Sequence, residues 1–464
     1  MSSVSKFLDD PVSSEVLVGT YALVFVLSSV LPGAPTPGYV LTWPALQRSE
    51  YRLSGLRVLV LVLALAWALC SHGLADARFF FERYAHCAAA ACLLGLAVSA
   101  ACYVQGRALR AAGAIDRRAW CPTIDDLAKG VRPKATAAAA AAAVAPAERA
   151  TPKGAGKAAR RASSAAAAPA LVVAPAAAPA SLTAEFDARS EPEHFYCGLG
   201  HFNPQWGAVD GKMWLYVVGA VQLQLNLASI VAAHVLGRRA LGAAAPPGLA
   251  LPGGAGSVGF AMLAYGACLS FFVVEYMANE QVHLQTYDIF RERVGLKLVW
   301  GCFFFYPFFY AIGGLGLAAS PASDISPAAA AGCIALFFLG WTLTRGANMQ
   351  KAACKGGAAD FSWCGVRISM ETVPGSGGRV LCGGFWGVSR HVNYLGEILQ
   401  GVALALPGWL ATGSLVPWLY PLYYVALFVP RQVDDDSKCL QKYGRAVWGE
   451  YVRRVPSRIV PFVY

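Results

Sequence analysis

The stretch SVGFAMLAYGACLSFFVVEYM (Ser257–Met277) contains a single charged residue, Glu275, in 21 positions. A helix rises about 1.5 Å per residue, so about 20 apolar residues are enough to cross the hydrocarbon core of a bilayer. The stretch therefore predicts a transmembrane helix, and the charged residue within it marks a candidate functional site.

The rest of the chain repeats this apolar pattern. Hydrophobic residues make up 56% of the 464 residues and charged residues only 14%, whereas soluble domains contain roughly a quarter charged residues. We therefore expect an all-α fold, a polytopic membrane bundle of about 8–10 transmembrane helices. The predicted spans are Val16–Leu31, Val58–Leu74, Tyr84–Tyr103, Met213–Leu236, Ser257–Met277, Leu296–Leu317, Ala328–Leu343, Ile398–Leu410 and Leu415–Val429. The last two are separated near Pro407-Gly408 and are expected to form a hairpin or a re-entrant pair.

A low-complexity segment interrupts the apolar pattern. Residues 129–185 are rich in Ala and Pro and contain Arg160-Arg161, which predicts a disordered basic loop. This loop separates the N-terminal transmembrane helices (1–128) from the central ones (186–343) and from a C-terminal region (344–464). The positive-inside rule predicts that the loop and the C-terminal region face the cytoplasm.

The net charge of +11 and the 13 cysteines indicate neither nucleic acid nor metal as a ligand. The basic residues lie mostly in loops between apolar runs, without a nucleic-acid-binding signature, so we expect membrane lipid and not nucleic acid as the partner. The cysteines lie mostly within apolar runs and form no C-x-x-C pair, which is typical of small buried residues.

Three carboxylates lie at or beyond the end of the opening span. Glu275, Glu280 and Asp288 follow one another in VVEYMANEQVHLQTYDI (Val273–Ile289). A carboxylate in or beside a membrane span is costly to desolvate, so these residues are candidate catalytic groups. The alternative is that they mark the exit of the helix from the membrane, where this cost is small.

Two polar regions near the carboxyl end predict a nucleotide site without a Rossmann fold. TRGANMQKAACK (Thr344–Lys355) places Lys351 and Lys355 one helical turn apart, where two cations suit phosphate groups. GFWGVSRHVNYLGEILQG (Gly384–Gly401) and RQVDDDSKCLQKYG (Arg431–Gly444) add aromatic, amide and acidic groups on either side of an apolar hairpin. Such groups can stack a nicotinamide or adenine ring and bind ribose hydroxyls. A positively charged flank and an interfacial aromatic belt are the alternatives.

These motifs, in this order, resemble the membrane sterol reductase family, which comprises the Δ14-, Δ7- and C24(28)-sterol reductases and the sterol-reductase half of the lamin B receptor. The resemblance covers nearly the whole chain except the Ala/Pro-rich segment, and it is most specific in the C-terminal region. It rests on LPG (Leu31–Gly33), YRLSGL (Tyr51–Leu56), FNPQWGAVDGKMW (Phe202–Trp214), NEQVHLQTYDI (Asn279–Ile289), TRGANMQK (Thr344–Lys351), GFWGVSRHVNYLGE (Gly384–Glu397), KCLQKYG (Lys438–Gly444) and VPSRIVPFVY (Val455–Tyr464).

The resemblance implies a multi-pass protein of the endoplasmic reticulum membrane that uses NADPH to reduce a double bond of a sterol. It implies a sterol pocket within 186–343 and an NADPH-binding region with a helical hairpin in 344–464. ALALPG (Ala403–Gly408) and the closing RIVPFVY are similar to Δ14 enzymes, so the C14=C15 bond is the predicted target and Δ7 reduction is the alternative. The implied cofactor-binding residues are Lys351, Lys355, Leu381, Trp386, Arg390, His391, Asn393, Tyr394, Asp435, Cys439, Lys442, Tyr443 and Tyr451.

An isolated sterol alkene needs a proton before it accepts hydride, and an apolar pocket gives an acid the raised pKa that this step requires. Glu280 and Glu275 are the predicted catalytic acids, with Asp288 third. The chain also departs from the family: Phe272 stands where many members have Tyr, and Gln281 replaces an acid. A non-catalytic sterol-binding protein of the same fold is therefore an alternative, and an isoprenylcysteine-type methyltransferase, with a similar RH-x-x-Y pattern, is another.

Overall fold

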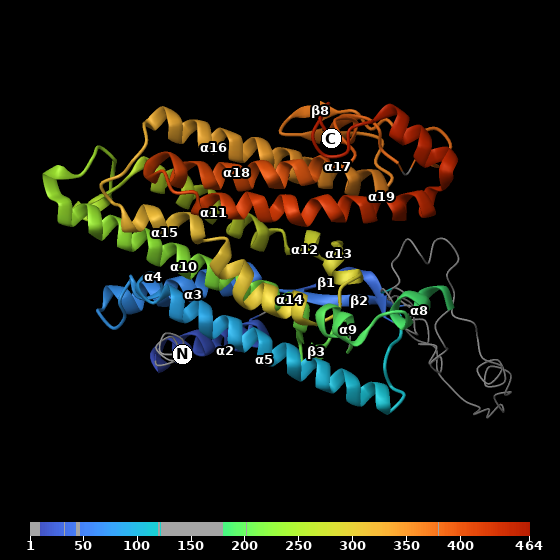
Figure 1. Ribbon diagram of the computed structural model, residues 1–464, viewed down its shortest axis with the longest axis horizontal. Helices are drawn as coiled ribbons and strands as arrows, with labels where there is room; N and C mark the ends of the chain where they lie inside the picture. Colours follow the sequence, from blue (N-terminus) through green and yellow to red (C-terminus); the bar gives the residue numbers. More distant parts are fainter. Residues whose placement is uncertain are drawn as a thin grey trace, which may run out of the picture.

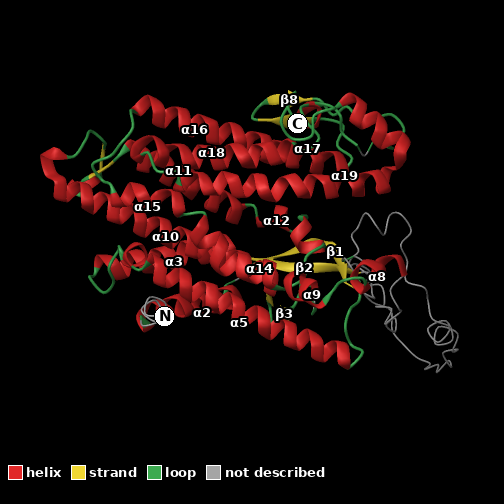
Figure 2. Cartoon of the chain, viewed as in Figure 1, coloured by secondary structure: helices red, strands yellow, loops and turns green. Residues whose placement is uncertain are grey.

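The computed structural model describes residues 10–31, 33–42, 47–118, 121, 180–200, 202–378 and 380–464. Long helices lie side by side in it, and short helices and small two-stranded antiparallel ribbons connect them (Figures 1 and 2). The α-helices of the described part are α2 (Pro11–Val30), α3 (Gly55–Ser71), α4 (Phe79–Glu82), α5 (Tyr84–Ala111), α8 (Ala180–Asp187), α9 (Glu191–Cys197), α10 (Gly211–Leu241), α11 (Phe260–Ala278), α12 (Glu280–His283), α13 (Tyr287–Phe290), α14 (Leu296–Trp300), α15 (Ile312–Ala319), α16 (Pro327–Trp341), α17 (Ala347–Lys355), α18 (Val392–Thr412) and α19 (Leu419–Arg454). The ribbons pair β1 (Ala34–Thr42) with β2 (Gln47–Leu53), β3 (Gln205–Trp206) with β4 (Val209–Asp210), β5 (Leu249–Ala250) with β6 (Ser257–Val258), and β7 (Phe361–Trp363) with β8 (Val366–Ile368).

Within the described residues, seven helical stretches are long and apolar enough to cross a membrane. They are Pro11–Val30, Tyr84–Ala111, Gly211–Ala244, Phe260–Ala278, Leu296–Ala319, Pro327–Lys355 and Val392–Thr412. The two other predicted segments are also helical: one is the shorter apolar helix α3, and the other lies at the start of α19. The predicted class, a polytopic all-α membrane bundle, is confirmed.

Helix α10 lies at the centre of the bundle. In Figure 1 the blue helices α2, α3 and α5 lie below it, and the orange and red helices α16, α18 and α19 lie above it. Most α10 side chains are buried, and two of the polar ones form a chain of hydrogen bonds: the Gln222 amide donates to Asn226 (2.9 Å), which donates to the carbonyl of Pro307 (2.9 Å). These bonds satisfy polar groups that would be costly to leave unpaired in a membrane.

Pro307 lies inside a π-helical stretch, η3 (Gly301–Phe309). Proline has no N–H, so it cannot donate the bond that an α-helix would give to the carbonyl of Phe303. The hydroxyl of Tyr21 in α2 donates to that carbonyl at 2.7 Å. This bond holds a helix from the N-terminal part of the chain against the centre of the bundle.

Helices α16 and α18 approach each other through two glycines. A Cβ added at Gly396 would lie 2.5 Å from the carbonyl oxygen of Gly340 and 2.3 Å from Oγ1 of Thr344. A Cβ at Gly340 would lie 2.6 Å from the carbonyl oxygen of Gly396. Small residues allow such close packing of helices in membranes, and here the contact positions the first turn of α18, which carries Asn393 and Tyr394.

The predicted hairpin of the last two apolar segments is present, but the predicted break at Pro407-Gly408 is wrong. Helix α18 continues through Pro407 to Thr412, and the chain turns at Gly413, whose φ of +71° lies in the left-handed region that favours glycine. Neighbouring helices in a membrane bundle accommodate a helical proline. Helix α19 then continues as far as Arg454, with non-helical dihedral angles at Gly444.

The predicted Ala/Pro-rich loop, 129–185, lies outside the described residues up to position 179. The prediction of a loop is wrong for its last six residues, which belong to α8.

Candidate functional site

A lysine from α17 lies over a fixed indole ring. The Nζ of Lys351 is 4.9 Å from the ring centre of Trp386, which belongs to the 3-10 turn η5 (Gly384–Gly387). The indole N–H donates to the carbonyl oxygen of Ala347 at 2.9 Å, and this bond ties η5 to the first turn of α17. The Lys351 residue is exposed, whereas Trp386 is buried. A cation beside an immobilised aromatic face is suited to a ligand that carries phosphate and a flat ring.

An aromatic group on α19 is joined to the backbone of Trp386. The Tyr451 hydroxyl donates to the carbonyl oxygen of Trp386 at 3.1 Å. The Tyr451 ring lies 5.1 Å from that of Trp448, which stacks on Tyr443 at 6.5 Å with an interplanar angle of 16°. Three predicted residues that are far apart in sequence therefore meet within one group.

Leu381 and Cys439 belong to the same region. Leu381 packs with Trp386 and Ala347 in an apolar cluster, and Cys439 packs in the neighbouring cluster that contains Tyr451. Burial raises the pKa of the Cys439 thiol, and the ammonium of Lys351 acts on the same thiol in the opposite direction. The two groups are therefore close enough to interact, which brings α17 and α19 together at this point.

Two predicted lysines lie at the edge of the cluster. The Nζ of Lys442 is 5.3 Å from the ring centre of its neighbour Tyr443. The Nζ of Lys355 is 5.3 Å from the ring centre of Tyr39 in β1, so the N-terminal ribbon reaches the C-terminal region.

Arg390 and His391 are held by the chain itself. The Arg390 guanidinium donates to the carbonyl oxygens of Val455 (3.0 Å) and Pro456 (2.7 Å) and to Asp436 (3.3 Å). The Nε2 of His391 lies 3.0 Å from the other Asp436 oxygen. Burial raises the pKa of Asp436, but the His391 hydrogen bond and the nearby charges outweigh it and the pKa is lowered. Both side chains, predicted to contact the cofactor, thus anchor the C-terminal segment to the start of α18.

Asn393 and Tyr394 begin α18 next to this anchor. The Tyr394 hydroxyl donates to Asp435 at 2.5 Å, and its ring is sandwiched between His391 (5.3 Å) and Phe428 (4.5 Å), each at an interplanar angle of 11°. The buried side-chain oxygen of Asn393 has no hydrogen-bond partner among the described residues. A buried acceptor without a donor is costly, so this atom indicates a place where a ligand can donate a hydrogen bond.

A continuous series of aromatic rings, here called the aromatic tract, leads from Tyr394 into the bundle. Successive ring centres along it lie between 4.5 and 6.3 Å apart. The tract consists of Tyr394, Phe428, Tyr424, Tyr420, Tyr310, Tyr306 and Tyr276. The tract starts at the C-terminal residues and ends on α11.

The sequence reasoning missed the tyrosines of this tract other than Tyr394. Their spacing is a usable signal, since Tyr306 and Tyr310, and likewise Tyr420 and Tyr424, are four residues apart and share a helical face. Phe272, at the position where the resemblance implies a tyrosine, stacks on Tyr276 at 6.2 Å. Tyr276 therefore supplies a phenol one helical turn away from position 272.

The three candidate acids have different surroundings. Glu275 is held by Arg345 of η4 (Thr342–Gly346) through two bonds of 2.5 and 2.6 Å, so both of its oxygens are engaged. Asp288 is half-buried, and its backbone carbonyl accepts a bond of 2.8 Å from the buried ammonium of Lys212. Glu280 is 5% exposed, and one of its oxygens accepts the backbone N–H of Gly55 at 2.8 Å. Burial raises the pKa of Glu280 to about 7.

The short helix that begins at Glu280 reaches the inner end of the aromatic tract through its last residue. Glu280 begins α12, whose last residue, His283, has its ring centre 3.5 Å from that of Tyr276. Burial lowers the pKa of His283 to about 4, so the imidazole is neutral at physiological pH. Of the three carboxyls, Glu280 is the one that combines burial with a raised pKa.

Comparison with known proteins gives concordant matches. A model of the ergosterol biosynthesis ERG4/ERG24 family matches residues 10–117 and 194–464. Delta(14)-sterol reductase of Arabidopsis thaliana is 31% identical over 262 residues, which make up 56% of this chain and 63% of that protein. Delta(14)-sterol reductase TM7SF2 of Mus musculus is 39% identical over 210 residues, 45% of this chain and 48% of that protein. The 7-dehydrocholesterol reductase of Danio rerio is 31% identical over 218 residues, 45% of this chain and 44% of that protein. The matched part thus spans between about two fifths and two thirds of these relatives.

Proposed function

The chain belongs to the ergosterol biosynthesis ERG4/ERG24 family, and we propose that it reduces the C14=C15 double bond of a sterol with NADPH, as a multi-pass protein of the endoplasmic reticulum membrane. Two of the relatives described above are named Delta(14)-sterol reductases, which favours this bond. The match to a 7-dehydrocholesterol reductase supports the C7=C8 bond as the second candidate.

The observation that carries the proposal is the junction between the polar C-terminal residues and the aromatic tract at Tyr394. On one side lie the ammonium of Lys351, the indole of Trp386 and the Tyr451 phenol; on the other, tyrosines continue into the membrane bundle. A charged dinucleotide and an apolar sterol require these opposite environments, and their reacting atoms have to meet where the two environments join.

The residues present fit NADPH. Lys351 would bind phosphate, Trp386 and Tyr443 would pack against the rings, and the side-chain oxygen of Asn393, which lacks a partner among the described residues, would accept an amide N–H. Asp435 and Tyr394 would bind hydroxyl groups. NADPH supplies a hydride when it is bound.

The proton is assigned to Glu280. A carboxylic acid with a pKa of about 7 is protonated in about half of the molecules at neutral pH, whereas an ordinary carboxyl is almost fully ionised there. Glu280 would donate this proton to one alkene carbon and would regain a proton from water, while bound NADPH would supply the hydride for the other carbon. Glu275, with both oxygens held by Arg345, would position η4 instead.

Sterol profiling of a yeast strain that lacks its own Δ14-reductase tests the proposal. Expression of the chain should remove the accumulated Δ14-sterols, and the Lys351→Ala variant should do so far less. Loss of C7=C8 sterols with persistent Δ14-sterols would instead establish the second candidate. If neither profile changes although the protein is present in the membrane, the protein is a non-catalytic relative.

A binding assay on solubilised protein distinguishes the proposed reductase from the remaining alternative, a methyltransferase. NADPH should bind and S-adenosylmethionine should not. The reverse result would contradict a reductase and identify a methyltransferase-like site.

A further inference from the structure

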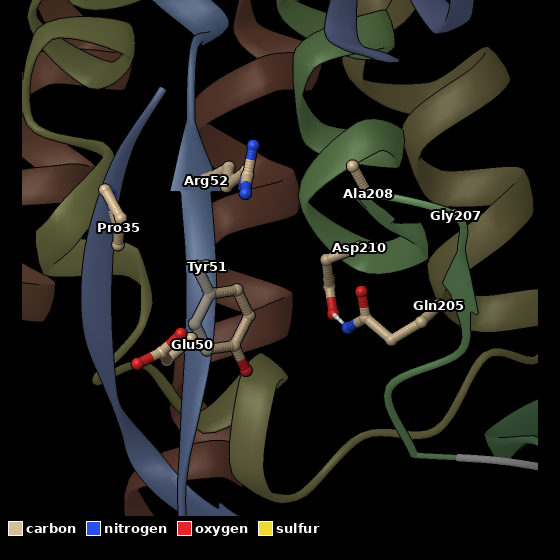
Figure 3. A pocket seen from close by; sticks show the side chains of 8 residues that line it. All are labelled: Pro35, Glu50, Tyr51, Arg52, Gln205, Gly207, Ala208 and Asp210. Carbon is tan, nitrogen blue, oxygen red and sulfur yellow. Dashed lines mark hydrogen bonds between the residues drawn. The ribbon is translucent and has the colours of Figure 1, made fainter. Parts of the chain in front are cut away.

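Two features of the molecule have no role in the proposed reductase function. One is the cavity of about 200 Å³ between β2 and the β3–β4 ribbon (Figure 3). Its charged residues, Glu50 and Arg52, are exposed on one face of β2, whereas Tyr51 between them is buried on the other face, so no single ligand can contact all three. The other feature is apolar and lies near the carboxyl end of the chain.

Residues 460–464, here called the C-terminal tip, expose large apolar side chains. Phe462 is fully exposed, and Val463 is 81% exposed. Ile459, directly before the tip, is 2% exposed and packs in the main apolar core of the bundle. The chain therefore passes from the core to the surface within three residues and presents two apolar side chains there. Exposed apolar groups of this size indicate a surface that contacts something other than water.

Hydrogen bonds close the C-terminal tip into a fixed turn. The backbone N–H of Arg458 donates to the carbonyl oxygen of Tyr464 at 2.8 Å, and the N–H of Tyr464 donates to the carbonyl oxygen of Val460 at 3.0 Å. The N–H of Phe462 donates to the Ser457 hydroxyl at 3.0 Å. Phe462 has a φ of +63°, in the left-handed region that a bulky residue rarely adopts. The turn itself therefore holds the Phe462 side chain away from the protein.

The tip lies at the level where α18 enters the membrane. The segment that leads into the tip pairs with the two residues that precede α18: the backbone N–H of Arg390 donates to the carbonyl oxygen of Ser457 (3.0 Å), and that of His391 donates to the carbonyl oxygen of Arg458 (2.8 Å). Helix α18 starts at the next residue, Val392, and is long and apolar enough to cross the membrane. The start of this span and the C-terminal tip are thus held at the same height.

The chemistry of the neighbouring side chains fits a lipid surface. The exposed Arg458 guanidinium lies 5.4 Å from the ring centre of Tyr464, which is exposed as well. Tyrosine is typical of the headgroup level of a membrane, and arginine there binds lipid phosphate. Phe462 and Val463 add the apolar groups that enter the boundary between headgroups and acyl chains. The tip thus combines the three kinds of side chain that this boundary region accommodates.

We propose that the C-terminal tip inserts Phe462 and Val463 into the membrane leaflet at which α18 begins, and that Arg458 binds lipid phosphate beside them. The insertion holds the C-terminal segment from outside, whereas the bonds of Arg390 and Asp436 hold it from within the protein. The lipid contact thereby supports the segment that lies next to the first turn of α18. This inference does not depend on the reductase activity.

The test places a fluorescent amino acid at position 462 of the full chain during translation. The protein is reconstituted into vesicles of phosphatidylcholine and phosphatidylserine with brominated acyl chains, which quench the probe on contact. We expect at least a twofold loss of fluorescence relative to vesicles without bromine.

Two exposed leucines of α19 are the matched controls. Leu440 lies about 16 Å along the helix beyond Val429, the end of the last predicted span. The probe at position 440 should therefore keep its fluorescence. Leu422 lies within that predicted span, so the probe at position 422 should be quenched at least as strongly as at position 462.

Quenching at position 462 that is no stronger than at position 440 would overturn the proposal. Iodide in the water phase distinguishes the remaining states of the tip. A probe that iodide quenches and brominated lipid does not is in water, and a probe that neither quenches is covered by protein, either a second copy of the chain or another partner. Both results contradict insertion into the leaflet. Because Phe462 is fully exposed, the probe should leave the melting temperature in detergent unchanged, which serves as the check on folding.

Discussion

The backbone N–H of Gly55 donates a 2.8 Å hydrogen bond to Glu280, across 225 residues of sequence. Gly55 is the first residue of α3, and a Cβ there would lie 2.5 Å from the other oxygen of the Glu280 carboxyl. The carboxyl is thus held against the N-terminus of a helix, which favours its charged form, while burial disfavours that form. Burial prevails, since the pKa rises to about 7.

Glu280→Gln should lower kcat for sterol reduction at least 100-fold, because a general acid contributes roughly 10²–10⁴ in rate and an amide cannot donate the proton in this way. The amide oxygen can still accept the Gly55 N–H, so the affinity for NADPH should stay within about twofold, judged by the usual size of surface effects. Steady-state kinetics and NADPH titration check this. If the Glu280→Gln variant keeps half of the wild-type activity, another residue donates the proton.

The raised pKa of Glu280 should also be visible in how the stability of the protein depends on pH. The folded-state pKa of about 7 lies above the ordinary glutamate value of 4.5, so the folded protein binds the proton more tightly. The stabilisation is fully present below about pH 4.5 and is lost as the pH rises through 7, with a total of about 3 kcal/mol. Melting temperatures of the wild type and of Glu280→Gln should therefore diverge between pH 5 and 8 in favour of the variant. Parallel curves would contradict the raised pKa.

Lys351→Ala should raise the KM for NADPH by tenfold or more, in keeping with a lost phosphate contact of about 1.4 kcal/mol, and leave the KM for sterol nearly unchanged. Lys438, an exposed lysine paired with Asp434 one turn away, provides the control substitution. Equal effects on both KM values would reject a cofactor role for Lys351.

Asp436→Asn should destabilise the protein by about 2 kcal/mol, because it removes the carboxylate that Arg390 and His391 share in a largely buried site. Asp434→Asn breaks an exposed pair and should cost about 0.5 kcal/mol or less. Denaturation in detergent compares the two variants. Similar losses would mean that the C-terminal segment is anchored by other contacts.

Gly396→Ala should destabilise the bundle by about 1–3 kcal/mol, since the added carbon would lie 2.5 Å from the backbone oxygen of Gly340. Gly332→Ala in α16, where a Cβ meets nothing within 4 Å, should be neutral or slightly stabilising. The difference in melting temperature between the two variants measures the helix contact. If both are tolerated alike, α16 and α18 do not pack through these glycines.

The sequence predicted much of the fold because membrane helices are encoded locally. In a membrane the backbone groups of an apolar run have to be satisfied within the run, wherever its neighbours lie, and all nine predicted segments are largely helical. The end of α18 was not predicted correctly, because whether a helix tolerates Pro407 depends on the helices around it. The C-terminal residues could be recognised as a group because their types, in that order, are characteristic of one family.

What only the tertiary structure decided is which polar groups pair. Glu275 and Arg345 are 70 residues apart, and Arg390 finds its acceptors at Val455 and Pro456; nothing in the local sequence distinguishes these structural roles from catalytic ones. The sequence alone thus determined the helices and the chemical groups available, because hydrophobicity and side-chain chemistry are local properties. The partners, the burial and hence the proton affinity of Glu280 depend on contacts between distant segments, which exist only in the folded chain.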